Sequence, residues 1–219
     1  MAPTSRFPWP QRTTLTAGVL LLVSALLLQI VRSRAALPVT GTITIPLGGP
    51  VVAFAEAAVH GAAFVVAALG IAGEVGIAGP SRLGRTALVV WGVRDLVLAV
   101  LGSVATGSGP GASVLVVLGT ALSVLFPATA VVAAVVVARA EVLSGLARWV
   151  LVPVAVLACA SGSLSFLPAP VVLGVATALV AVPIELLDPV LTALVGIAFL
   201  LWSRMEAVKH RARTAYEAW

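Results

Sequence analysis

The sequence predicts an all-α membrane protein, a polytopic transmembrane helical bundle of about six spans. Of the 219 residues, 61% are hydrophobic and only 10% are charged, with a mean hydropathy of +1.17. A water-soluble fold of this length needs far more charged side chains to cover its surface. In addition, apolar windows of about 20 residues, enough to cross a bilayer as a helix, recur along the chain. We therefore expect lipid to be the main solvent of this protein.

The first predicted span covers 13–31, and its apolar run is longer than that of a signal peptide, so we expect it to be retained. The second span covers 51–72 and the third covers 86–106. Between them, glycines recur every third residue up to Pro80. Because glycine and proline interrupt helices, this stretch is predicted to be a flexible connector.

The fourth predicted span covers 113–138 and the fifth covers 149–167. Pro127 lies in the middle of the fourth span. Proline removes one backbone hydrogen bond and clashes with the preceding turn, so the sequence predicts a kink there.

The last part of the chain is ambiguous, because 171–202 is an apolar stretch interrupted by prolines and acids. As one helix it would be about 48 Å long, against a hydrocarbon core of about 30 Å. Asp188 followed by Pro189 has the pattern of an N-cap and a first helical residue. We therefore expect the last span at 188–204, with 171–187 as an interfacial or re-entrant helix. Two short spans are the alternative.

The basic residues predict the orientation, because lysine and arginine accumulate on the cytoplasmic side of a membrane. With six spans and cytoplasmic termini, 10 of the 13 basic residues lie inside. Seven spans would leave six inside and six outside. We therefore predict a single integral-membrane domain, 1–219, in the plasma (inner) membrane. The ten inside residues are Arg6, Arg12, Arg82, Arg85, Arg139, Arg148, Arg204, Lys209, Arg211 and Arg213.

Four ionisable residues fall inside predicted spans: Glu56 and His60 in the second, Arg94 and Asp95 in the third. Charges in hydrocarbon are costly, so such residues usually face the bundle interior and pair. Glu56 and His60 share one helix face, and Arg94 and Asp95 point about 100° apart. The depths of His60 and Asp95 in their spans match, so the sequence predicts one intramembrane polar cluster. Two interpretations stay open. In the first, the cluster is a proton or ion relay or the polar end of a ligand cavity; in the second, it is a structural lock between two helices.

A second acidic pair, Glu185 and Asp188, is predicted near the outer face beside two prolines. Broken helices at polar positions mark binding sites in some transporters. Acids beside a proline also cap helices at the membrane interface, and both interpretations stay open.

Motifs that would identify an activity are absent from the sequence. The single cysteine, Cys159, forms no metal motif, the basic residues form no patch suited to nucleic acid, and no catalytic residue, cofactor or metal site is predicted. We expect a non-enzymatic accessory subunit or a small permease, with an integral-membrane enzyme acting on a lipid or another hydrophobic substrate as the alternative. Expected partners are the bilayer, anionic lipids at the basic tail 203–219, and a membrane-protein partner or a second copy of the chain.

Overall fold

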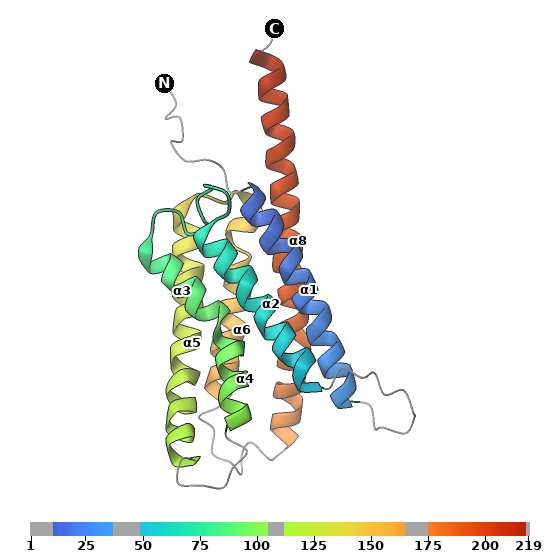
Figure 1. The fold of residues 1–219 in the computed structure, drawn as a ribbon, viewed down its shortest axis with the longest axis vertical. Helices are drawn as coiled ribbons and strands as arrows, with labels where there is room; N and C mark the ends of the chain where they lie inside the picture. Colours follow the sequence, from blue (N-terminus) through green and yellow to red (C-terminus); the bar gives the residue numbers. More distant parts are fainter. Residues whose placement is uncertain (1–10, 37–48, 105–111, 165–174, 218–219) are drawn as a thin grey trace.

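The computed structural model describes residues 11–36, 49–104, 112–164 and 175–217. Within these ranges the chain is helical and contains no strand. Consecutive long helices run antiparallel in one bundle, and the first turn of α1 and the last turns of α8 lie at the same end (Figure 1). The elements are α1 Gln11–Ala36, α2 Gly49–Leu69, α3 Arg82–Gly92, α4 Arg94–Val104, α5 Ala112–Ala140, the 3-10 turn η1 Gly145–Arg148, α6 Leu151–Leu164 and α8 Val175–Glu217.

Helix length and surface composition confirm the predicted membrane bundle. Among the described residues, five helical segments are long and apolar enough to cross a membrane. The consecutive helices α3 and α4 make one further passage along the bundle (Figure 1). Large apolar side chains such as Leu26, Val117 and Leu201 are 67%, 69% and 58% exposed. An outer surface of this kind is stable in lipid and would aggregate in water.

The third predicted span, 86–106, is two helices that meet at Val93. Gly92 lies so close to α2 that a Cβ there would be 2.5 Å from the Cβ of Phe64. On the other side of this contact, a Cβ on Gly61 would be 3.2 Å from the Gly92 carbonyl oxygen. The two glycines thus allow α2 and α3 to touch backbone to backbone, as small residues do between membrane helices.

The predicted start of a helix at Asp188 is wrong, because residues 175–217 form one continuous helix, α8. Its 43 residues correspond to about 64 Å. Pro189 lies inside it as a buried residue. Membrane helices tolerate internal proline where neighbouring helices supply compensating contacts. Here α1 packs along α8, and a Cβ on Gly18 would lie 2.8 Å from the Gly196 carbonyl oxygen.

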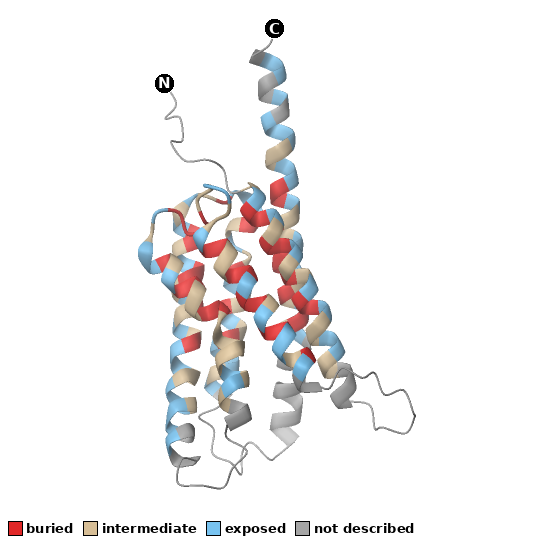
Figure 2. Ribbon diagram, viewed as in Figure 1, coloured by how far each residue is buried: buried red, intermediate tan, exposed pale blue. Residues whose placement is uncertain are grey.

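One end of the bundle, which we call the closed half, carries the loops 70–81 and 141–150. Its interior is packed with large side chains, and Ile77, Leu88 and Trp202 are each at most 2% exposed. The buried residues of the bundle are concentrated toward this end (Figure 2).

The loop 70–81 differs from the flexible connector predicted for it. The Ile77 backbone N–H donates to the Ala67 carbonyl oxygen at 2.8 Å. The Glu74 carboxylate accepts from the backbone N–H groups of Arg12 at 3.0 Å and Thr13 at 2.7 Å. Because the first N–H groups of a helix have no partner within the helix, Glu74 caps the N-terminus of α1. The glycines therefore serve tight turns in a packed loop.

Candidate functional site

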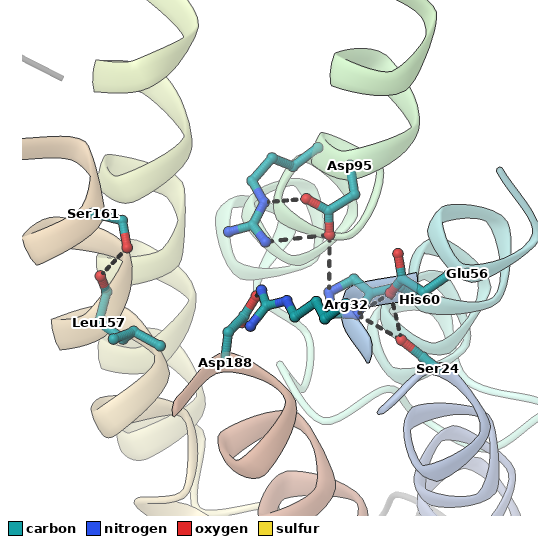
Figure 3. Close-up of polar contacts among 9 residues, drawn as sticks. Ser24, Arg32, Glu56, His60, Asp95, Leu157, Ser161 and Asp188 are labelled. Carbon is teal, nitrogen blue, oxygen red and sulfur yellow. Dashed lines mark hydrogen bonds and ion pairs between the residues drawn. The ribbon is translucent and has the colours of Figure 1, made fainter. Parts of the chain in front are cut away.

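The buried core of the site is formed by α1 and α2. The Ser24 hydroxyl donates to Glu56 Oε1 at 2.9 Å and lies 3.2 Å from His60 Nδ1. Glu56 and His60, four residues apart on α2, are 7% and 6% exposed, and Ser24 is fully buried. Ser24 thus holds the carboxylate and the imidazole against α1 (Figure 3).

Arg94 and Asp95 begin α4 directly after the break at Val93. Arg94 Nε donates to Asp95 Oδ1 at 2.8 Å, and Arg94 Nη2 donates to Asp95 Oδ2 at 3.2 Å. The sequence-based expectation that the two side chains point apart is therefore not what the structure shows. The arginine also stacks on Trp91, with its Cζ 4.0 Å from the ring centroid. Stacked in this way, the guanidinium faces the carboxylate of Asp95, the next residue in the sequence.

Asp95 links this ion pair to α2. His60 Nε2 lies 3.8 Å from Asp95 Oδ2, across the close glycine contact between Gly61 and Gly92. Gly61 follows His60 directly, and Gly92 lies three residues before Asp95. The close contact of the two glycines therefore brings the His60 and Asp95 side chains together. The backbone contact therefore sets the geometry of the polar site.

A second ion pair closes the site from α1 and α8. Arg32 Nη2 donates to Asp188 Oδ2 at 3.1 Å, and the two side chains are 28% and 35% exposed. Arg32 and Asp188 lie beside the His60 and Asp95 side chains (Figure 3). We call the set Ser24, Arg32, Glu56, His60, Arg94, Asp95 and Asp188 the polar cluster.

Two cavities adjoin the polar cluster, and we call this part of the molecule the cavity half. Cavity 1, of about 310 Å³, lies between α4, α5, α6 and α8 and is lined by Arg94, Phe126 and Ser161, among others. Cavity 2, of about 250 Å³, lies on the α2 side and is lined by Glu56 and His60, among others. The residues common to both linings are Arg32, Asp95, Leu98, Asp188 and Thr192.

Two buried nitrogens of the cluster have no hydrogen-bond partner in the described part of the chain. They are His60 Nε2 and Arg32 Nη1. Buried polar atoms are nearly always hydrogen-bonded, and a water or a bound ligand commonly supplies the partner that a protein lacks. Both residues line cavity 2. These two nitrogens are therefore available to contact a water molecule or a ligand bound in cavity 2.

The charges of the polar cluster do not balance. It holds the carboxylates of Glu56, Asp95 and Asp188 and the guanidinium groups of Arg32 and Arg94, which sum to −1 when all three carboxylates are ionised and His60 is neutral. Asp95 and Asp188 each pair with an arginine. Glu56 hydrogen-bonds to the neutral Ser24. In that protonation state, a bound cation would balance the charge of the site.

The structure brings together the four residues of the predicted intramembrane cluster and adds Asp188 to them. Glu185 lies within α8, but its side chain is outside the part that the structure describes. Sequence reasoning missed both Ser24 and Arg32. A serine inside an apolar span was the available signal for Ser24. The Arg32 contact had none, because it depends on how α1 packs on α8.

The fold and the site define the class of protein: a multi-pass α-helical membrane protein with an internal charged cluster that adjoins two cavities. No protein-family model, curated protein or solved structure matches the chain.

Proposed function

We propose that the protein is a small permease that binds a polar solute or an ion beside the polar cluster. The observation that carries this proposal is the pair of cavities, of about 310 and 250 Å³, that share Arg32, Asp95 and Asp188 in their linings. Charged residues inside a membrane commonly line solute or ion pathways. A purely structural lock between helices would need only the paired charges, packed without space around them.

The contrast between the two ends of the bundle supports the same proposal. The cavities occupy one half, whereas Trp202 and its neighbours fill the other. A permease holds its binding site behind a barrier on one side, and the closed half provides such a barrier. Opening it is the conformational change that transport would require.

Reconstitution into proteoliposomes tests the proposal. Uptake of potassium, zinc, phosphate and a neutral amino acid is measured separately in vesicles with and without the purified protein. We expect protein-dependent flux of one of these probes. Ala158→Leu should abolish it by filling cavity 1, which Ala158 lines. Cys159→Leu is the matched control, because Cys159 is the next residue on α6 and is exposed.

Absence of flux for every probe, with correctly folded protein, would contradict the permease proposal and favour an accessory role. An equal loss of flux in Ala158→Leu and Cys159→Leu would contradict the assignment of cavity 1 as part of the pathway.

An integral-membrane enzyme acting on a lipid or another hydrophobic substrate is the second candidate. It is favoured by the mixed lining of cavity 1, which joins Arg94 and Asp95 to the apolar Phe126, Leu157 and Leu191. Mass spectrometry of lipid extracts after incubation with the protein distinguishes the two candidates. A new lipid product formed without solute flux would select the enzyme.

For orientation, we propose that the end of the bundle at which α1 begins and α8 ends faces the cytoplasm of a plasma membrane. The basic residues Arg82, Arg85 and Arg148 support this, as each belongs to or adjoins a loop of the closed half.

The exposed Lys209, on the last turns of α8, supports contact with anionic lipid headgroups. Reporter fusions after Gly109 and at the C-terminus test the topology. An external C-terminal reporter would overturn it.

A further inference from the structure

We propose that Glu56, His60 and Asp95 bind one divalent transition-metal cation, such as Zn²⁺ or Mn²⁺. Such binding goes beyond the proposed permease, because it does not require that the protein moves a solute across the membrane. The site lies at the contact between α2 and α4, where the three side chains converge (Figure 3).

The donor atoms have the spacing that such a site requires. One imidazole nitrogen and one oxygen from each carboxylate lie within 4.8 Å of one another. Metal bonds of about 2.1 Å in a tetrahedral arrangement place donors about 3.4 Å apart. His60 Nε2 and Asp95 Oδ2 are already 3.8 Å apart. The Glu56 oxygen contacts the other side of the ring, 4.0 Å from His60 Nδ1, so metal binding at Nε2 requires a rotation of the Glu56 side chain toward Asp95.

The nitrogen that would bind the metal is buried and accepts or donates no hydrogen bond in the described part of the chain. His60 Nε2 has no hydrogen-bond partner in the described part of the chain, and His60 is only 6% exposed. Its other ring nitrogen lies 3.2 Å from the Ser24 hydroxyl. Metal-binding histidines characteristically use one nitrogen for the metal and the other for a hydrogen bond that fixes the ring.

Charge and access are consistent with a cation. With its three carboxylates ionised and His60 neutral, the cluster sums to −1, and a divalent cation bound by Glu56 compensates this charge. Arg94 does not block Asp95, because an ionised carboxylate has about four acceptor positions and the arginine uses two. Cavity 2 is lined by all three proposed ligands and provides space for the waters that complete the coordination.

The donor set indicates which metals fit. One imidazole and two carboxylates suit Zn²⁺, Mn²⁺ and Fe²⁺, whereas Ca²⁺ and Mg²⁺ prefer oxygen donors alone. Cu(I) prefers sulfur ligands, and none is among the three residues. We therefore expect transition metals to bind and Mg²⁺ to compete weakly.

The test uses the full-length protein without a histidine tag, in detergent micelles and stripped with a chelator. Zn²⁺ binding is measured by calorimetry, and Co²⁺ binding by its visible absorption. We expect one saturable equivalent, with binding at least tenfold weaker in His60→Gln and in Asp95→Asn. His210→Gln is the matched control, since His210 is exposed on α8 and far along the chain from the site, and it should leave binding unchanged.

The wild-type protein alone provides a second measurement, which keeps the test valid if a variant fails to fold. X-ray absorption of the Zn²⁺ complex should show one imidazole and oxygen donors. Absence of saturable binding, equal binding by His60→Gln and the wild type, or a spectrum without imidazole would each overturn the proposal. A failed transport assay with intact metal binding would contradict the permease and leave the metal site supported.

Discussion

The closed half and the cavity half of the bundle use the same helices in different ways. In the closed half, Trp202 and Leu88 fill the interior, and the Trp202 indole donates to the Ser144 hydroxyl at 3.1 Å. In the cavity half, the interior holds ion pairs such as Arg32–Asp188 and two cavities. One half is therefore built for packing density, and the other retains space and unpaired polar atoms.

This difference separates the half that contributes packing from the half in which we place the proposed binding site. Buried side chains are concentrated toward the closed half (Figure 2). Buried ion pairs gain little net stability, because desolvation offsets their attraction. We therefore expect substitutions in the closed half to lower stability, and substitutions in the cavity half to affect binding or transport more than folding.

The largest effect is expected from Gly76→Ala in the loop 70–81. A Cβ at Gly76 would lie 2.0 Å from the Ala68 carbonyl oxygen, so the backbone of the closed half must shift. We expect the free energy of unfolding to fall by about 3 kcal/mol or more, measured by SDS titration followed by circular dichroism. Gly119→Ala is the control, since nothing lies within 4 Å of its Cβ position. Equal stability of the two variants would contradict the tight packing of this loop.

Trp202→Ala should lower the free energy of unfolding by about 3 kcal/mol. Its side chain is 2% exposed, so its removal leaves an unfilled space and breaks the hydrogen bond to Ser144. Trp149→Ala provides the comparison, because Trp149 is 57% exposed and should change stability by less than about 1 kcal/mol. The same titration measures both. Similar losses for both tryptophans would remove the distinction between packed and open positions.

A pair of alanine substitutions tests the cavity directly. Ala133→Leu, in the packed interior of α5 at 2% exposure, should lower the free energy of unfolding by about 1–3 kcal/mol through overpacking. Ala158→Leu, which points to cavity 1, should change it by less than about 1 kcal/mol. If Ala158→Leu is the more destabilising of the two, cavity 1 is not open space in the folded protein.

The smallest effect is expected for the Arg32–Asp188 pair. Because both side chains are about a third exposed, their coupling should be about 0.5–1 kcal/mol. A double-mutant cycle with Arg32→Gln, Asp188→Asn and the double variant measures it by SDS titration. A coupling of several kcal/mol would show that this ion pair contributes substantially to the stability of the fold. It would then contradict the expectation that the cavity half contributes little to stability.

The sequence was sufficient for features that depend on local composition. Apolar windows and the spacing of Glu56 and His60 predicted the membrane bundle and one shared helix face, because hydropathy and helical periodicity are local properties. The same reasoning failed at Pro189, where local helix-start signals were outweighed by the packing of α8 on α1. It also treated the glycines of 70–81 as a break in structure, although the loop is packed and hydrogen-bonded.

By itself, therefore, the sequence determined the helical membrane class of the protein and the shared helix face of Glu56 and His60. Only the tertiary structure decided that Arg32 meets Asp188, that Ser24 holds Glu56 and that cavities remain beside them. The physical reason is that these contacts join residues on different helices. Their distances depend on how closely the helices approach, which for α1 and α8 is set by the contact between Gly18 and Gly196 and which no local pattern encodes.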